Sequence, residues 1–330
     1  MKVVQIERFG APEVLEVAEI SSPEPQGDEV LIEVEAAGVN RADLLTRSGL
    51  YHRTGQPPLV PGFEGSGVVR DVGDSVERFS PGDRVFAFGG RPGFYAEQVA
   101  VSERRVVGVP EGLDFASAAA LPTAPLSAWY CLRNLARLGA GEKILIYAAA
   151  SGVGDAAVQI AKLTDAEVLA VAGSEDKVAW ALRNGADHGV NYAEHDVLSE
   201  IDVIFGEGGV DVVLDAVGGI RFAEALKAVG HGGRVVTLAN VALEPSTVDT
   251  RDFYPKSATI HGFQLTNLVE RLGYDPRGDL EELARLAARG ELKVHVDIIF
   301  PLAEAAEAHR HMEGRRNRGK VILELERKHT

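Results

Sequence analysis

The residues best suited to bind a ligand are two glycines that open a helix directly after an apolar strand. Lys143–Tyr147 is a short β-type run, and Ser151, Gly152, Val153 and Gly154 follow it closely. Backbone amides in such a turn can approach a pyrophosphate, and the N-terminus of a helix favours its negative charge. The pattern predicts a dinucleotide site, although a tight strand-to-helix turn that binds nothing would look similar.

The kind of dinucleotide depends on the end of the next strand. An NAD site normally carries an acidic residue about 20 residues after the glycines, where it holds the ribose 2′-hydroxyl. Counting from Gly154 leads to Gly173 and Ser174, and Lys177 follows. A missing carboxylate and a nearby cation favour a 2′-phosphate, and therefore NADPH. The two acidic residues between Ser174 and Lys177 would weaken that site if they faced it, and Lys177 could instead only cap a solvated helix face.

The elements that position this turn alternate between strands and helices for about 120 residues after Pro122. Ser127–Leu138 has helical spacing, and the strands are nearly continuous apolar runs that suit burial on both faces of a parallel sheet. The expected strands are Lys143–Tyr147, Val168–Ala172, Asp211–Asp215, Arg234–Leu238 and Thr259–Phe263, and the expected helices are Gly154–Leu163, Asp176–Asn184 and Arg221–Val229.

The chain before Pro122 consists of short β-type runs, such as Glu29–Glu35, broken by proline and glycine every ten residues or so. The tail predicts two helices, Asp279–Gly290 and Leu302–Glu313, and a strand at Val321–Leu325. It is too small for a third domain. We therefore expect a discontinuous β-rich domain, residues 1–122 and 264–330, interrupted by a nucleotide-binding domain at residues 123–263.

Composition narrows the function classes. The 330 residues include 34 basic and 49 acidic side chains, a net charge of −15, which would repel nucleic acid from most of the surface. Cys131 is the single cysteine, so neither an internal disulfide nor a thiolate metal cluster can form. The sequence shows no signal peptide and no apolar run of membrane-spanning length. These features predict a cytoplasmic protein with no membrane partner.

Several motifs spread along the chain carry a family resemblance. They are Gly38–Asp43, Pro61–Gly67, Pro81–Val85, Tyr95–Glu97, and Gly141–Lys143 followed by Ala149–Gly154 with Gln159 and Lys162. The chain resembles the zinc-free quinone oxidoreductase branch, which includes zeta-crystallin, of the medium-chain dehydrogenase/reductase superfamily. The resemblance implies an α/β fold in which a GroES-like β-rich catalytic domain holds a Rossmann doubly wound parallel-sheet domain.

The same resemblance implies catalytic residues. Asn40 would lie near the nicotinamide, Asp43 would organise the same loop, and Tyr51 would line the substrate cleft, where its hydroxyl could bind a quinone oxygen. Thr123 and Ser127 are candidate polar wall residues, Thr123 as a catalytic residue and Ser127 as a cofactor contact. Tyr51 could instead be a half-buried packing residue, and Asp43, like Glu64, could hold the domain together without touching substrate.

The resemblance also extends the cofactor site. Lys177 and Tyr192 match the family's 2′-phosphate contacts, whereas Ser151 stands where the family usually has glycine. Asp155 would oppose a nearby phosphate, so we expect it to point away from the cofactor. Strand ends of a parallel sheet and one basic run supply the other expected cofactor contacts. Those further residues are Val217, Ala239, Asn240, Phe263, Arg315 and Lys320.

The metal of the zinc-dependent relatives has no ligand set here. By resemblance, Asn40, Phe63 and Thr123 stand where those enzymes have Cys, His and Cys, and His309 and His311 do not share a helix face. A hydride acceptor must then be electrophilic by itself, which favours quinones. The expected activity is NADPH-dependent quinone reduction, and the alternatives are an alkenal or enone reductase and a non-catalytic NADPH-binding protein.

Assembly is the last expectation. The family commonly pairs its nucleotide domains through the final strand, which corresponds to Thr259–Phe263. An exposed apolar strand edge needs a cover, so a homodimer is expected.

Overall fold

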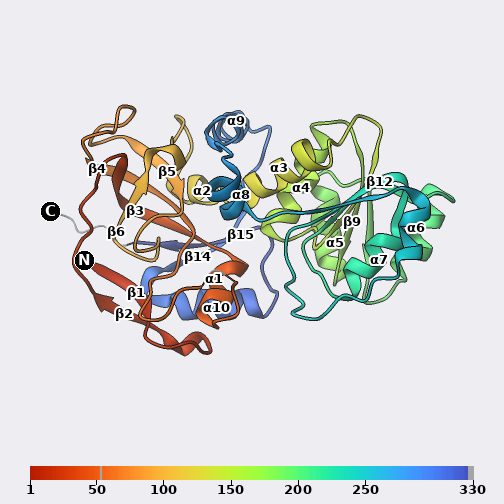
Figure 1. Cartoon of the computed structure of the whole chain (residues 1–330), viewed down its shortest axis with the longest axis horizontal. Helices are drawn as coiled ribbons and strands as arrows, with labels where there is room; N and C mark the ends of the chain where they lie inside the picture. Colours follow the sequence, from red (N-terminus) through yellow and green to blue (C-terminus); the bar gives the residue numbers. More distant parts are fainter. Residues whose placement is uncertain (53, 326–330) are drawn as a thin grey trace. The chain divides into compact units, whose positions relative to one another are not determined.

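A computed structural model of the chain describes residues 1–52 and 54–325 and divides them between two units (Figure 1). Unit 1 contains Met1–Leu126 and the chain from Tyr274 onward, and unit 2 contains Ser127–Gly273. The boundaries expected from the sequence, 122 and 263, fall earlier in the chain. The later second boundary places helix α8 (Leu265–Leu272), which the sequence patterns did not predict, in unit 2.

Unit 1 is built on a seven-stranded sheet in the order β14-β15-β3-β4-β5-β7, with β6 also paired to β3. Its long central strand, β3, has two partners on one side: Glu29–Glu33 pairs with β6, and Ala36–Val39 pairs with β15. Two distant parts of the sequence therefore share one strand. The strands are β3 (Glu29–Val39), β4 (Glu64–Val72), β5 (Arg84–Phe88), β6 (Gln98–Ser102), β7 (Val106–Gly108), β14 (Val296–Pro301) and β15 (Lys320–Glu324).

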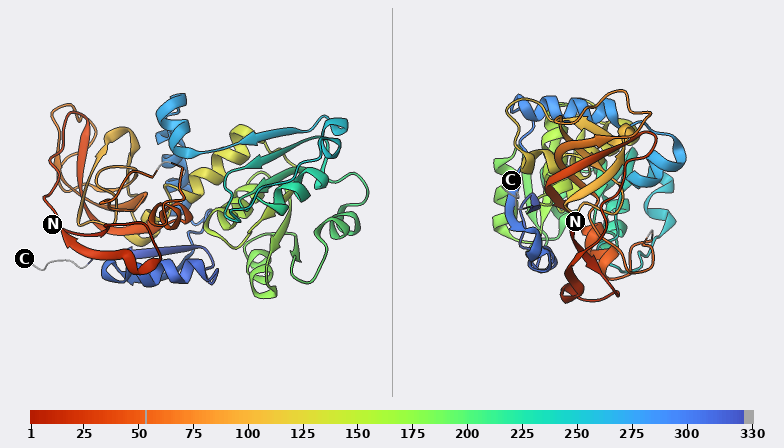
Figure 2. Two further views of the ribbon diagram at one scale, coloured as in Figure 1. Left: turned by 60° about the horizontal axis from the view of Figure 1, so that its bottom comes forward. Right: turned by 90° about the vertical axis from the view of Figure 1, so that its left-hand side faces the viewer.

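Short helices and a two-stranded ribbon complete unit 1. The ribbon joins β1 (Lys2–Ile6) to β2 (Leu15–Glu19), and Figures 1 and 2 both show it beside α10. Glu13, in the short turn that connects β1 to β2, forms an ion pair of 2.5 Å with Arg310 of that helix. The helices are α1 (Arg41–Arg47), α2 (Phe115–Ala119), α9 (Arg277–Ala288) and α10 (Ala305–Glu313), and α3 (Ala124–Tyr130) crosses the boundary to unit 2.

Unit 2 has a six-stranded sheet in which every neighbouring pair is parallel. The order β10-β9-β8-β11-β12-β13 is the 3-2-1-4-5-6 order of a dinucleotide-binding fold. The strands are β8 (Lys143–Tyr147), β9 (Glu167–Ala172), β10 (His188–Asn191), β11 (Val210–Asp215), β12 (Val229–Thr237) and β13 (Thr259–Gly262), and the helices are α4 (Gly152–Lys162), α5 (Glu175–Arg183), α6 (Val197–Phe205), α7 (Ile220–Ala228) and α8.

The helices α1, α2, α6 and α8 and the strands β10 and β14 were absent from the sequence prediction. Helix α6 is rich in β-branched residues, a composition more typical of strands, but Asp196 caps it by accepting the backbone N–H of Ser199. The segment Ser127–Leu138 is also less regular than expected. Helix α3 passes into a π-type turn at Cys131–Leu135, because its hydrogen bonds shift to a wider spacing there.

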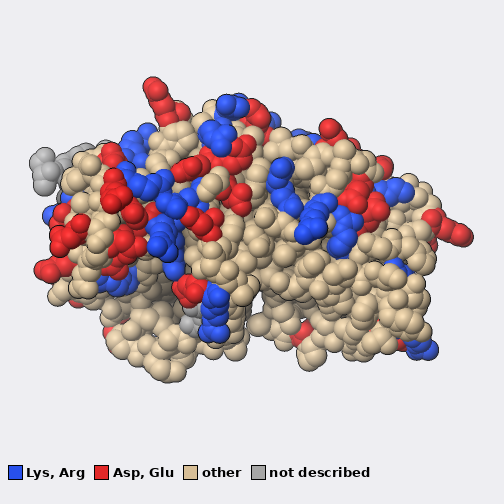
Figure 3. All heavy atoms as spheres, turned by 45° about the horizontal axis from the view of Figure 1, so that its top comes forward, with Lys and Arg blue, Asp and Glu red and all other residues tan. Residues whose placement is uncertain are grey.

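Within residues 1–52 and 54–325, every helix is too short or too polar to cross a membrane. Figure 3 shows that on the face drawn there, Lys and Arg side chains are mixed with Asp and Glu and form no continuous basic surface.

Candidate active site

The carboxyl ends of the unit 2 strands bring most of the predicted cofactor residues to one edge of the sheet. All six strands are parallel, so their ends lie along that edge in the order of the sheet. Ligands of open parallel sheets bind outside this edge. The loops that follow the strands carry, in spatial order, Tyr192, then Gly173 and Ser174, then Ser151–Gly154, then Val217, then Ala239 and Asn240, and finally Phe263.

The glycine turn after β8 is shaped by close approach of backbone to backbone. A Cβ atom on Gly154 would lie 2.2 Å from the carbonyl oxygen of Ala148, so only glycine fits there. Ser151 is the N-cap of α4, and its hydroxyl oxygen accepts the backbone N–H of Gly154 at 3.1 Å. The serine that replaces the usual family glycine therefore stabilises the helix start.

Asp155 lies in the first turn of α4 but is directed toward α5. Its carboxylate accepts hydrogen bonds from Asn184 Nδ2 at 2.9 Å and from Trp180 Nε1 at 3.2 Å. The side chain is buried between the two helices. The Asp155 carboxylate is therefore satisfied by hydrogen-bond donors from α5 and its C-cap residue.

The end of β9 carries Gly173 and Ser174 in place of an acidic residue. A Cβ atom on Gly173 would lie 2.6 Å from the hydroxyl oxygen of Tyr192. The guanidinium of Arg221 in turn lies over the ring of Tyr192, 4.5 Å from its centroid, and pairs with Glu224. Arg221 was not identified from the sequence, because nothing in its helical context distinguishes it from a surface arginine.

On the β11 side of β8, at the same carboxyl-terminal edge of the unit 2 sheet, a buried carboxylate organises the loop after β11. Asp215 accepts the backbone N–H of Val217 at 2.8 Å and of Gly218 at 3.0 Å. Burial raises the pKa of Asp215, although these hydrogen bonds act in the opposite direction. A Cβ on Gly218 would lie 2.7 Å from Asn240 Oδ1, which packs the β11 and β12 loops together.

Two further predicted residues belong to unit 2. Ser127 is buried in α3. Phe263 stacks on Tyr130, with ring centroids 5.7 Å apart. The structure gives no ligand contact for either residue, so their cofactor role stays a prediction.

In unit 1, the start of α1 holds Asn40 and Asp43. Asp43 Oδ2 accepts the backbone N–H of Asn40 at 2.7 Å, as in a capping box, and Oδ1 accepts that of Gly62 at 2.9 Å. The Asp43 carboxylate therefore joins the helix start to the loop before β4. Burial raises the pKa of Asp43 from 3.8 to about 7, while the two N–H groups and the charge of Lys320 partly offset this effect.

Beside Asn40 lies a buried ion pair. Lys320 Nζ donates to Glu64 Oε1 at 2.5 Å, to Asn40 Oδ1 at 2.7 Å and to the Val39 carbonyl at 3.2 Å. Glu64 Oε1 also accepts from Asn40 Nδ2 at 2.7 Å, and Oε2 accepts the backbone N–H of Thr123 at 2.7 Å. We call Asn40, Asp43, Glu64 and Lys320 the Lys320 cluster.

This geometry corrects the expected role of Lys320. The sequence placed its ammonium on a cofactor phosphate, but the side chain is buried and its three N–H groups all point to protein oxygens. The error came from counting Lys320 with the exposed basic run before it. Arg315, in that run, is exposed. Burial lowers the pKa of the Arg41 guanidinium, and the nearby positive charge of Arg315 lowers it further.

Tyr51 packs against Phe63, with ring centroids 5.4 Å apart in an edge-to-face arrangement, and against His52. The ring is half-buried. The structure thus contains the aromatic packing expected if Tyr51 is a packing residue. Binding of a quinone oxygen by the Tyr51 hydroxyl stays a prediction. In the described residues, no group of three or more His, Cys, Asp or Glu side chains is arranged to hold a metal ion.

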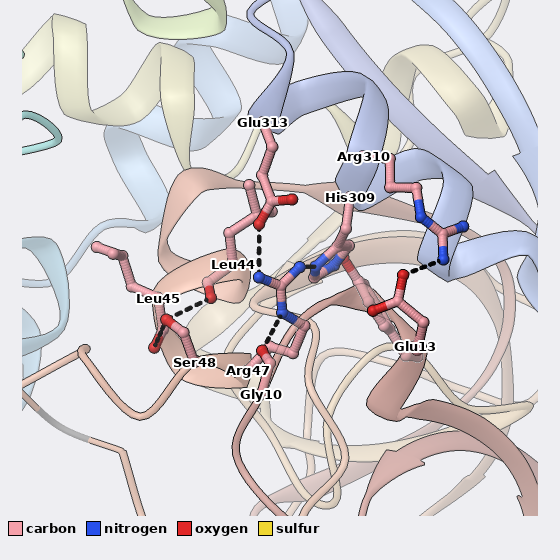
Figure 4. A network of polar contacts seen from close by, with 10 residues as sticks. Gly10, Glu13, Leu44, Leu45, Arg47, Ser48, His309, Arg310 and Glu313 are labelled. Carbon is pink, nitrogen blue, oxygen red and sulfur yellow. Dashed lines mark hydrogen bonds and ion pairs between the residues drawn. The ribbon is translucent and has the colours of Figure 1, made fainter.

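A second polar cluster lies at the other end of α1 (Figure 4). Arg47 donates to the Gly10 carbonyl at 3.0 Å and to Glu313 at 2.5 Å, and its Nη1 lies 3.5 Å from His309 Nδ1. The hydroxyl of Tyr95 lies 3.0 Å from His309 Nε2. Burial, with a smaller contribution from Arg47, lowers the pKa of His309 from 6.5 to about 3. We call Arg47, Tyr95, His309 and Glu313 the Arg47 cluster.

Most of the predicted site residues thus fall into two groups, one in each unit. Unit 1 brings together Asn40, Asp43, Thr123 and Lys320, and unit 2 aligns the strand-end residues. From the sequence, Glu64 was considered only as a possible structural residue. In the structure, its carboxylate accepts hydrogen bonds from Asn40, Thr123 and Lys320 and so connects these residues.

Comparisons with known proteins agree with this architecture. Residues 26–111 match the alcohol dehydrogenase GroES-like domain, and residues 184–323 match the zinc-binding dehydrogenase family. The second match does not include positions 40, 63 and 123. The quinone oxidoreductase of Sus scrofa is 34% identical over 334 residues, which cover 98% of each chain.

Solved structures show the same fold. The Escherichia coli quinone oxidoreductase complexed with NADPH superposes with a TM-score of 0.91 at 29% identity, over 98% of this chain and 100% of the other. A structure described as an NAD-dependent alcohol dehydrogenase has a TM-score of 0.90 at 35% identity, over 99% and 100%. The chain is therefore an oxidoreductase with a GroES-like and a Rossmann-type domain, and it belongs to the quinone oxidoreductase, zeta-crystallin-like branch of the medium-chain dehydrogenase/reductase superfamily.

Proposed function

We propose that this protein is an NADPH-dependent quinone reductase that works without a metal ion. The observation that carries the coenzyme assignment is the end of β9, where a Cβ on Gly173 would lie 2.6 Å from Tyr192 Oη. Neither Gly173 nor Ser174 supplies the carboxylate that would hold the 2′-hydroxyl of NADH, and Lys177 follows in the first turn of α5.

The residues present fit a dinucleotide. The glycine turn brings the backbone close to the N-terminus of α4, where a pyrophosphate is favoured. Lys177 and Tyr192 would hold the 2′-phosphate. We keep Ser151–Gly154, Gly173, Ser174, Val217, Ala239, Asn240 and Phe263 as contacts along the cofactor, and Arg315 as a phosphate contact.

Bound NADPH supplies a hydride. In this proposal, the side-chain N–H group of Asn40 donates a hydrogen bond to the quinone, and the Tyr51 hydroxyl donates one to a quinone oxygen. Asp43 holds the loop of Asn40 through the backbone N–H groups of Asn40 and Gly62. By resemblance, Asn40, Phe63 and Thr123 replace the metal ligands of the zinc-dependent relatives, so in this proposal the substrate is already electrophilic, as a quinone is.

Coenzyme choice is tested by Lys177→Ala. Loss of a charge-assisted phosphate contact costs about 1.5–3 kcal/mol, so NADPH should bind about tenfold or more weakly, while NADH binding barely changes. Lys227→Ala, an exposed lysine on α7 of the same unit, is the matched control. An equal loss for both coenzymes would show that Lys177 does not read the 2′-phosphate.

The substrate class is tested by steady-state oxidation of NADPH with 1,4-benzoquinone and with a simple enone. Preference for the enone would replace the proposal by its double-bond reductase alternative, and binding of NADPH with no turnover would favour a non-catalytic role. A chelator should leave quinone turnover intact. Stoichiometric zinc that is lost together with activity would contradict the metal-independent mechanism.

We further propose a homodimer through β13. This strand ends the unit 2 sheet, pairs only with β12 and exposes Ile260. A two-fold partner would continue the sheet. Sedimentation at micromolar concentration should give a dimer, and Ile260→Pro should weaken it because proline cannot donate its backbone hydrogen bond. A wild-type monomer at that concentration would exclude a stable dimer.

A further inference from the structure

Lys320 has a role that the sequence did not assign. We propose that Lys320 is a positioning residue, which with Glu64 fixes the orientation of the Asn40 carboxamide and thereby directs one of its N–H bonds to the substrate. This inference rests on the proposed function of Asn40, and it adds two residues, distant in the sequence, that control that function.

The ammonium group of Lys320 is fully committed to protein oxygens. Its three hydrogens match three acceptors, which are Glu64 Oε1, Asn40 Oδ1 and the Val39 carbonyl. The side chains of Lys320 and Glu64 are 6% and 0% exposed, so water does not screen the pair. Lys320 therefore acts on its neighbours and is not a direct ligand for substrate or coenzyme.

The two charges leave the Asn40 carboxamide one favourable orientation. Its oxygen faces the ammonium of Lys320 at 2.7 Å, and its nitrogen faces the carboxylate of Glu64 at 2.7 Å. Rotation by 180° would place the NH₂ group against the cation and the oxygen against the anion. Both contacts would become repulsive in a buried setting, so the charge pair selects the observed orientation.

The selected orientation determines what Asn40 offers to a ligand. Its nitrogen carries two hydrogens, and Glu64 accepts one of them. The second hydrogen remains for a ligand acceptor such as a carbonyl oxygen. In the opposite orientation, Asn40 would present its oxygen and repel the same carbonyl.

The pair also connects positions occupied by metal ligands in the zinc-dependent relatives. Asn40 and Thr123 match two of those positions, and both donate to Glu64, Asn40 through its side chain and Thr123 through its backbone. Lys320 thus places its ammonium group beside Asn40. This charge is satisfied by protein oxygens, so it organises a hydrogen-bond donor and does not polarise substrate directly.

The test replaces both charges together, because the loss of one alone would leave an uncompensated buried ion. In Lys320→Met/Glu64→Gln, kcat with 1,4-benzoquinone should fall at least tenfold, while the Kd of NADPH changes less than twofold. Lys162→Met, which removes an ion pair with Asp187 in unit 2, is the matched control and should leave kcat unchanged. A double variant with kcat within twofold of wild type would overturn the proposal.

A cycle with Asn40→Ala separates positioning from a general structural role. If Lys320 and Glu64 act through Asn40, adding their replacements to Asn40→Ala should change kcat less than twofold. Losses that multiply would show that the pair acts independently of Asn40, and the proposal would fail. Urea unfolding of each variant identifies any loss that is only a loss of folding.

A readout that needs no turnover distinguishes this inference from the proposed function. The side-chain amide of Asn40 can be assigned in a ¹⁵N NMR spectrum by its disappearance in Asn40→Ala. Wild type should show one amide proton shifted by its hydrogen bond to the Glu64 carboxylate, and this shift should be smaller in the double variant, because a neutral carboxamide oxygen is a weaker acceptor. Identical resonances in the two proteins would refute the positioning role, even if quinones prove not to be the substrate.

Discussion

The two polar clusters at opposite ends of α1 both bury a positive charge, but they differ in how the partners of that charge are exposed to water. Both tie this helix to the C-terminal segment, through β15 in the Lys320 cluster and through α10 in the Arg47 cluster. The first encloses a complete ion pair away from solvent. The second pairs a buried cation with a neutral histidine and with Glu313, whose side chain is 38% exposed. A sealed cluster depends on every partner, whereas water can replace a partner in an open one.

The largest expected effect breaks the sealed cluster. Glu64→Gln removes the anion that compensates Lys320, so the free energy of unfolding should fall by about 3–5 kcal/mol. Urea unfolding measures this change. Adding Lys320→Met should restore most of the stability, because the buried cation is then removed as well.

The matching change in the open cluster is Glu313→Gln. Water can reach this side chain, so the loss should be about 1 kcal/mol or less. Equal losses for Glu64→Gln and Glu313→Gln would contradict the contrast between the clusters.

Arg47→Met should have the next largest effect. The variant keeps the apolar stem but leaves the Gly10 carbonyl and Glu313 without their charged donor, at a cost of about 2–3 kcal/mol. Thermal or urea unfolding would detect it. Arg251→Met removes an exposed arginine paired with Asp249 and should cause no measurable change. A stable Arg47→Met protein would show that packing alone holds α1 and α10 together.

The pH dependence of stability should have opposite signs in the two clusters. Folding raises the pKa of Asp43 from 3.8 to about 7, so the folded state keeps a proton that the unfolded state loses. Asp43 therefore contributes less stability as pH rises through this window. His309 has a folded pKa of about 3 against 6.5, so its contribution is lost as pH falls from 6.5 toward 3.

Each of these groups would change stability by at most about 1.4 kcal/mol per pH unit. Unfolding free energies of wild type, Asp43→Asn and His309→Gln at pH 5, 6 and 7 separate the two contributions. Asp43→Asn should make stability rise more steeply with pH, and His309→Gln should make it rise less steeply. Parallel curves for all three proteins would mean that neither group titrates differently in the folded state.

Local patterns predicted much of unit 2. The apolar run Lys143–Tyr147 and the glycines after it are adjacent in sequence, so strand, turn and helix could be identified together. Strand β10 was missed because it is short and contains Gly189. A parallel sheet was expected, because alternating strands and helices favour one; the strand order itself was not predicted.

The contacts between distant residues could not be predicted in the same way. Glu64 and Lys320 are 256 residues apart, and the side chains that meet at Tyr192 come from different strand ends and α7. Charge alone assigned Lys320 to a phosphate, since burial is not visible in residue type. The register of β15 on β3 is what places it beside Asn40 instead.

The pairing of β3 with β15 also has a consequence for synthesis on the ribosome. The edge of β3 at Ala36–Val39 emerges early, but its partner follows about 280 residues later. At roughly 5–20 residues per second, this interval lasts roughly 15–60 s, long enough for unit 2 to be completed first. During that time, residues 36–39 of β3 lack their partner on the β15 side, and the Lys320 cluster does not exist. The nascent chain therefore passes through a stage in which unit 2 is complete and unit 1 is unfinished, with this edge of β3 open to mispairing.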